Sequence, residues 1–196
     1  MWEGGNFVKT LPVNPKVSMA EAVVVQKLKV AELGKIAGAM KKVTKVGFPK
    51  LPVRRNHTAH FMHVNLAAGV VTATATIEDG KITQQNVETN YELLQCSGGG
   101  LLEPMVSVTY SEQDNSLSFV LSAGTEDTDP DDVVYAAVFE SGRRLARLIK
   151  LGDRGDGGST SAALSQYWER DNLHVYAFAV SVDGKDASPS VHLTLA

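Results

Sequence analysis

The amino-acid sequence predicts a mainly β protein with an N-terminal helical part. From Gly69 to the C-terminus, apolar and polar residues largely alternate between turn signals, which is typical of strands. Before Gly69, apolar residues recur at spacings of three to five, which is typical of amphipathic helices. The predicted parts are an extended arm (1–17), a basic helical segment (18–69), a β-hairpin connector (70–103) and a β-sandwich (104–196).

The helical segment begins with a capping signal. Pro12 and Pro15 exclude a helix within the arm, because proline disfavours helical backbone at and before its own position. Ser18-Met19-Ala20-Glu21 then fits a capping box, and the pattern predicts a helix over Met19–Val46 that Gly47 ends. Its apolar stripe comprises Val24, Leu28, Leu33, Ile36, Met40 and Val43.

A second, shorter helix is expected over Asn56–Ala68. Its inward-facing residues are expected to be Phe61, Val64 and Ala68. In the first helix, Gly34 and Gly38 weaken the middle and mark either a bend or a close helix contact. Each helix is apolar on one side only, so both need a surface to lie against.

The connector reads as a hairpin followed by a third strand. Strands are predicted over 71–77 and 81–88, and Asp79-Gly80 between them is a hairpin turn signal. Tyr91–Ser97 is interpreted as another strand, closed by the three glycines at 98–100.

From Pro104 onward, seven short strands follow in about ninety residues. They are predicted over 105–110, 117–122, 133–140, 143–151, 159–164, 173–182 and 190–195. This regular series is typical of an immunoglobulin-like or fibronectin-III-like sandwich, although a Cys…Trp…Cys pattern of the antibody type is absent. The strand that begins at Leu173 is apolar on both faces, so we expect it to be central and covered on its outer side by the helices or a partner.

Charge is distributed unevenly along the chain. The net charge is only −3, yet residues 1–65 carry 11 basic and three acidic residues, and residues 66–196 carry eight basic and 19 acidic residues. A basic arm and helix can contact the acidic body of a neighbouring copy, and the alternative is simply two solvated surfaces. The basic candidates for subunit contact are Lys9, Lys16, Lys41, Lys42, Lys45, Arg54 and Arg55. The acidic candidates, all in one loop, are Glu126, Asp127, Asp129, Asp131 and Asp132, and the alternatives for this loop are a bound divalent ion or simple solvation.

Nucleic-acid binding is the weaker use of the basic segment. Its lysines can neutralise phosphates, but the side chains that usually read bases are missing, so DNA contact would be sequence-independent and is not favoured. Membrane association is not expected either, because the chain contains no long apolar run.

No motif predicts an enzyme, a cofactor or a metal site. Gly-x-Ser-x-Gly and a Gly-Lys-Ser/Thr phosphate loop are absent, and the three histidines at 57, 60 and 63 have no acidic residue in their helix. Cys96, the only cysteine, is expected to be a packed core residue. A single cysteine and the lack of a visible secretory signal fit synthesis in a reducing cytoplasm.

The stretch Gly152–Gly158 contains Arg154-Gly155-Asp156, a tripeptide that adhesion receptors recognise, and two aspartates that suggest a calcium loop. Because it joins two predicted strands and is rich in glycine and aspartate, we interpret it as a turn. Calcium would need more organised oxygen ligands than this stretch offers.

Three segments together resemble a known family: the arm and helix from "KTLPVNPKVSMAEAV" to "KVGF", the stretch "YELLQCSGGGLLEPMVSVTY", and the ending "DNLHVYAFAVSVDGKDASPSVHL". The chain resembles an uncharacterised family of bacterial proteins with relatives in tailed, crAss-like phages. Its departures are the Gly152–Gly158 loop and the Cys96-Ser97-Gly98 variant.

The resemblance implies an immunoglobulin-like module used in assembly, and brings no catalytic residues. The expected function is a non-enzymatic ring, neck or tail component of a virion, located in the phage particle, whose partners are copies of itself and other virion proteins. The alternative is a bacterial binding module that recognises a glycan or protein through sandwich loops such as Thr125–Asp132 and Gly152–Gly158.

Overall fold

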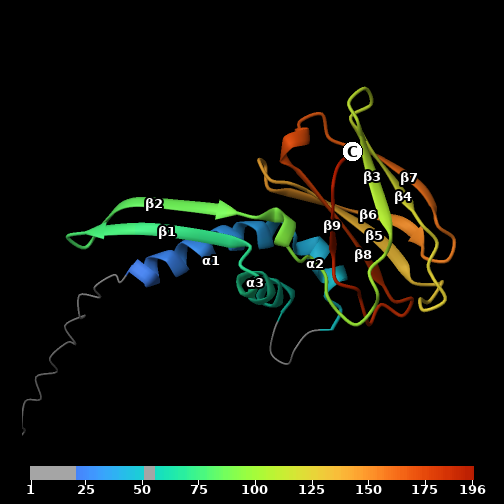
Figure 1. The fold of residues 1–196 in the computed structure, drawn as a ribbon, viewed down its shortest axis with the longest axis horizontal. Helices are drawn as coiled ribbons and strands as arrows, with labels where there is room; N and C mark the ends of the chain where they lie inside the picture. Colours follow the sequence, from blue (N-terminus) through green and yellow to red (C-terminus); the bar gives the residue numbers. More distant parts are fainter. Residues whose placement is uncertain (1–20, 51–55) are drawn as a thin grey trace, which may run out of the picture.

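The computed structural model describes residues 21–50 and 56–196, and confirms a mainly β protein with helices in its N-terminal part (Figure 1). The arm, the capping box at Ser18, and Arg54 and Arg55 lie outside the described residues. The helices are α1 (Glu21–Ala39), α2 (Lys41–Gly47) and α3 (His57–Ala67), with short 3-10 turns η1 (Tyr91–Leu93) and η2 (Arg170–Asn172). The strands are β1 (Val71–Glu78), β2 (Lys81–Thr89), β3 (Val106–Ser111), β4 (Ser116–Leu121), β5 (Val133–Glu140), β6 (Leu145–Asp153), β7 (Gly158–Ala163), β8 (Leu173–Val180) and β9 (Val191–Leu193).

The seven predicted strands of the C-terminal part are all present, as β3 to β9. They form an antiparallel three-stranded sheet in the order β3-β4-β7 and an antiparallel four-stranded sheet in the order β6-β5-β8-β9. Side chains from both sheets share one hydrophobic core, whose members include Leu117, Phe119 and Val175. The two sheets are therefore the layers of a β-sandwich.

Strands β5 and β8 are buried on both faces, as the sequence predicted for β8. Val175, Ala177 and Ala179 point into the sandwich core, whereas Tyr176 and Phe178 point into a second core on the outer side of the four-stranded sheet. All five side chains are fully buried. The helices supply the other half of this second core, so they are the cover that the two-sided pattern required.

The predicted single helix over Met19–Val46 is wrong in one respect, because α1 and α2 are separated at Met40. The Met40 backbone has ψ 3°, outside the helical region, so α2 continues in a new direction. The break lets α1 contact β1 while α2 contacts β6 and β8 of the sandwich. Gly34 and Gly38 do not mark a close contact, since a Cβ at either position would meet nothing within 4 Å.

Helix α3 begins at the expected residue. The Asn56 side chain caps it by accepting a hydrogen bond from the Ala59 backbone N–H (2.8 Å). Phe61 is fully buried as predicted and Val64 is half-buried, but Ala68 is exposed, and the second fully buried residue is Asn65. The Asn65 side chain accepts from the Gln95 N–H (2.7 Å) and donates to the Gln95 carbonyl (2.8 Å), which joins α3 to the segment after η1.

Strands β1 and β2 form the predicted hairpin, with Asp79 (φ 50°) and Gly80 (φ 74°) in its turn. Val71 and Ala75 of β1 are buried on the side that faces α1, and the threonines of the opposite face are exposed. Figure 1 shows this hairpin and α1 extending together away from the sandwich. We call this two-layer extension, residues 21–39 and 71–89, the protrusion.

The strand predicted over Tyr91–Ser97 is wrong. Tyr91 to Leu93 form the 3-10 turn η1, because the Asn90 side chain accepts a hydrogen bond from the Glu92 N–H (3.0 Å) and stabilises a turn there. The remaining residues run without regular structure along the helices, and Leu94 and Cys96 are buried in the helical core. Apolar residues alone therefore did not distinguish a strand from an irregular buried segment.

Candidate interaction surfaces

The basic residues of α2 are exposed, and two of them flank the start of α3. Lys41, Lys42 and Lys45 all lie on the surface. Lys41 and Lys45, one turn apart, line a hollow of about 270 Å³ with Asn56 and His57. The helix N-terminus adds partial positive charge, so this surface suits a carboxylate or another anion. The remaining basic candidates, Lys9, Lys16, Arg54 and Arg55, lie outside the described residues.

The acidic loop between β4 and β5 presents four of its five candidates to solvent. Glu126, Asp127, Asp129 and Asp131 are exposed, whereas Asp132 is only 2% exposed. Among the residues that the structure describes, no ion pair joins this loop to the lysines of α2. The two groups of opposite charge are therefore not partners within the described part of one chain.

Asp132 is instead paired with the arginine of the Arg-Gly-Asp tripeptide. Arg154 Nη1 lies 3.5 Å from Asp132 Oδ2, and Arg154 is also only 2% exposed. Burial raises the pKa of Asp132, and the Arg154 charge opposes that rise. The turn predicted for Gly152–Gly158 is confirmed, and the burial of its arginine removes the side chain that an adhesion receptor would need to reach.

A cavity of about 130 Å³ lies beside this ion pair, at the end of the sandwich, and we call it the end cavity. Its apolar wall comes from the segment before β3, where Leu102 and Met105 are each 55% exposed, and from Leu121 at the end of β4. Thr125 of the acidic loop and Arg154 complete it. The end cavity thus adjoins both loops that the sequence suggested for binding.

The protrusion exposes large apolar side chains. Val23 and Val30, two turns apart on α1, are 43% and 40% exposed, and Ile82 of β2 is 41% exposed. Among the described strands, β1 and β2 pair only with each other, so each keeps one unpaired edge. Exposed apolar side chains beside open strand edges are a common basis for contacts with another chain.

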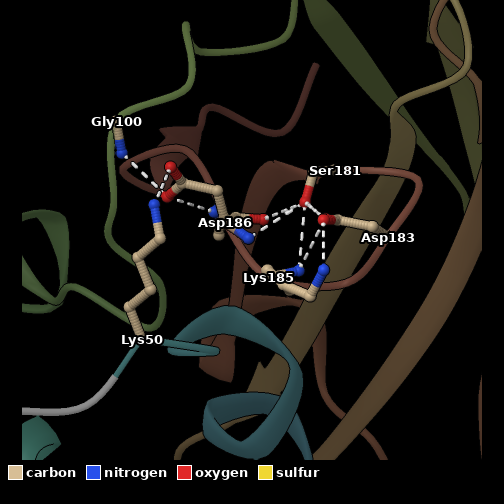
Figure 2. Close-up of polar contacts among 7 residues, drawn as sticks. Lys50, Gly100, Ser181, Asp183, Lys185 and Asp186 are labelled. Atoms are coloured by element: carbon tan, nitrogen blue, oxygen red, sulfur yellow. Dashed lines mark hydrogen bonds and ion pairs between the residues drawn. The ribbon is translucent and has the colours of Figure 1, made fainter.

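The end of the helical segment is fixed to the sandwich by a polar network, shown in Figure 2. Lys50 forms an ion pair with Asp186 in the loop between β8 and β9, and Asp186 also accepts a hydrogen bond from the Gly100 N–H (3.1 Å). In the same loop, Asp183 accepts from Ser181 Oγ (2.7 Å) and pairs with Lys185. These contacts lower the pKa of both aspartates, so the network holds over a wide acidic range.

Two histidines form the remaining cluster of titratable side chains. His174 of β8 and His192 of β9 lie diagonally across the sheet with ring centroids 6.2 Å apart, and they line a hollow of about 410 Å³ with Tyr91 and Glu92. Burial lowers the pKa of His174 to about 4 and also lowers that of His192. Within the described residues, no group of three histidine, cysteine or acidic side chains is arranged to hold a metal ion.

Cys96 is fully buried in the helical core, as expected. Burial raises the pKa of its thiol to about 12, so the thiolate that a nucleophile requires is not formed near neutral pH. In the described segments, no helix is both long and apolar enough to cross a membrane.

The structure adds residues that the sequence did not single out. Leu102, Met105 and Arg154 come from segments about 50 residues apart, and no sequence pattern links them. The exposed positions Val23 and Val30 are separated by seven residues, a helical spacing that a search for a second apolar stripe could have found. Comparisons with models of known protein families and with curated proteins return no match to this chain.

Proposed function

We propose that this chain is a non-enzymatic structural protein of a phage virion, a ring, neck or tail component of the head-to-tail region. It self-assembles through its N-terminal arm and helices, and its other partners are neighbouring virion proteins. The resemblance to the bacterial and tailed-phage family supports the place of the protein in a particle. The protrusion supports its role in assembly.

The observation that carries the assembly role is that the protrusion leaves apolar side chains exposed on both of its layers. Val30 lies on the helix and Ile82 on the hairpin, and each is about two-fifths exposed. A two-stranded hairpin is marginally stable in water by itself, and an open edge invites pairing with another strand. A second subunit packed against the protrusion would cover these side chains and complete the edges.

The division of seven strands into three plus four supports an immunoglobulin-like or fibronectin-III-like assignment for the body. In this arrangement the sandwich is the rigid body of the subunit, and the protrusion and arm are its connectors. Residues 1–65 carry 11 basic and three acidic residues, whereas residues 66–196 carry eight basic and 19 acidic residues, and this difference supports contact between the basic N-terminal part of one copy and the acidic body of the next.

The test is the mass of the full-length protein in solution, measured by light scattering over a wide concentration range. We expect a defined oligomer that Val30→Asp or Ile82→Asp converts to monomer. The matched control is Val182→Asp, at a position in the loop after β8 that is 66% exposed and far from the protrusion in sequence. Deletion of residues 1–17 is also expected to weaken the oligomer, and a wild-type monomer at every concentration would contradict the proposal.

One observation favours the alternative, a bacterial immunoglobulin-like module that binds a glycan or protein. The end cavity adjoins Thr125–Asp132 and Arg154, at the loops such a module would use. That function predicts a monomer whose ligand binding depends on these loops, so the same mass measurement separates the two functions.

A further inference from the structure

The end cavity has the features of a site for a peptide segment. It is small, and its walls are formed by apolar side chains of Leu102, Pro104, Met105 and Leu121. Leu102 and Met105 are each more than half exposed although they line an apolar hollow. A volume of about 130 Å³ is enough for one aliphatic side chain of the size of valine or leucine.

Arg154 supplies a buried hydrogen-bond donor at this cavity. Its Nη2 donates to the Leu102 carbonyl (2.6 Å) and its Nη1 lies beside Asp132, but among the described residues its buried Nε has no hydrogen-bond partner. The Arg154 side chain cannot easily turn away, because its Cγ lies close to Gly124. A Cβ added at Gly124 would be only 2.8 Å from that Cγ. The guanidinium is therefore a fixed part of the cavity wall.

The charge around Arg154 indicates what kind of acceptor fits. Asp132 already balances the guanidinium charge, so a second carboxylate would meet a nearly neutral pair. Glu103 on the cavity wall and the exposed Glu126 and Asp127 nearby would repel it further. A neutral backbone carbonyl is the better match, as at Leu102. A peptide with an aliphatic side chain beside a lysine therefore suits both the apolar cavity and its acidic rim.

The N-terminal arm has this composition. Leu11 stands between Lys9 and Lys16, and Pro12 and Pro15 favour an extended backbone with carbonyls available to a partner. The arm leads into α1, and Figure 1 shows that α1 begins at the end of the protrusion farthest from the sandwich. Helix α1 therefore begins away from the sandwich of its own chain.

We propose that the end cavity receives the N-terminal arm of a second copy of this chain, with the Leu11 side chain in the apolar hollow. Lys9 and Lys16 then lie near the acidic loop. This inference rests on the proposed self-assembly and names one of its contacts. Because the two surfaces differ, the contact is head-to-tail and repeats from subunit to subunit, which closes a ring where the rotation allows.

The test is disulfide formation between two differently substituted full-length chains. One chain carries Leu11→Cys, the other Met105→Cys, and the two are mixed and oxidised gently. The native Cys96 does not interfere because it is buried. Only a contact between chains can produce the mixed dimer, and holding the two thiols together raises its yield. The matched control replaces Met105→Cys with Val182→Cys, at another exposed apolar residue outside the end cavity.

We expect about tenfold more mixed dimer with Met105→Cys than with the control, since bound thiols have a much higher effective concentration. Adding Leu102→Asp to the Met105→Cys chain should lower the yield toward the control. Equal yields for the two pairs would overturn the proposal. If equal yields accompany a wild-type oligomer, the end cavity is not the contact but self-assembly stands; if they accompany a monomer, both proposals fail.

Discussion

The ring of Tyr91 lies stacked on the ring of His174, with centroids 4.0 Å apart and planes inclined by 24°. Tyr91 follows the end of the hairpin, and His174 is on β8, so this pair joins the protrusion to the outer face of the four-stranded sheet. Tyr176 Oη adds a hydrogen bond to the Tyr91 carbonyl (2.7 Å). These contacts around η1 add to the helical core in holding the protrusion against the four-stranded sheet.

Acid should weaken this junction through His174. Its pKa in the folded protein is about 4, below the ordinary value of 6.5, so the unfolded chain binds the proton more tightly. The neutral His174 ring therefore makes its full contribution to the free energy of unfolding above pH 6.5. That contribution is lost as the pH decreases toward 4, and the loss is about 1 kcal/mol for this half-buried ring. His174→Phe keeps a ring on Tyr91 but cannot titrate. We expect urea unfolding at the two ends of this pH range to show a smaller decrease in the free energy of unfolding for the variant than for the wild type. An equal decrease would exclude His174 as a cause.

Tyr176→Phe should destabilise the fold by about 1 kcal/mol, because it removes one buried hydrogen bond and keeps the aromatic packing. The Tyr91 carbonyl retains the Leu94 N–H as a partner, so the loss is limited. Tyr110→Phe is the matched control, since its hydroxyl reaches only the half-buried Asn115 side chain (3.2 Å). Chemical denaturation should rank the two variants in this order, and the reverse order would contradict the assignment.

Of the neighbouring glycines Gly99 and Gly100, only Gly99 is expected to reduce stability when alanine replaces it. A Cβ at Gly99 would lie 2.3 Å from Asp186 Oδ1 and 2.4 Å from the Ala187 carbonyl, whereas a Cβ at Gly100 would meet nothing closer than 3.4 Å. Gly99→Ala is therefore expected to cost about 1–3 kcal/mol, through displacement of the loop that holds Lys50. Gly100→Ala should be nearly neutral. Thermal unfolding of both variants distinguishes them, and similar melting temperatures would show that the loop adapts freely.

The Cys96 thiol should be inert in the native protein. Its pKa of about 12 and complete burial prevent thiolate formation and reagent access at pH 8. A colorimetric thiol reagent should react with it only after denaturant is added. Rapid reaction without denaturant would mean that the helical core opens locally around the segment after η1.

The sequence predicted most of the sandwich correctly because each of its strands combines an alternating or fully apolar pattern with a turn signal at its ends. It failed at Met40 and at Tyr91 for a shared reason. The direction of α2 is determined by the sheet it packs against, and the η1 turn depends on a side-chain cap from Asn90, and neither changes the apolar pattern. A tertiary contact therefore overrode local propensity at Met40, whereas a local side-chain cap did so at Tyr91.

The candidate surfaces were predictable only in part. The exposed lysines of α2 and the acidic loop follow directly from the charges along the chain. The burial of Asp132 and Arg154 does not, since a charged residue in a glycine-rich turn is normally solvated. Their pairing became visible only when the fold brought together the two loops at one end of the sandwich.

Strand β8 contributes to both hydrophobic cores, so neither core can open without exposing side chains of this strand. The helices cannot separate from the four-stranded sheet without exposing Tyr176 and Phe178, and the sheets cannot separate without exposing Val175 and Ala177. The two layers should therefore melt as one cooperative unit, and amide protons of β8 should exchange with solvent only through global unfolding. The free edge of β2 has no such coupling, so its outward amides should exchange by local opening.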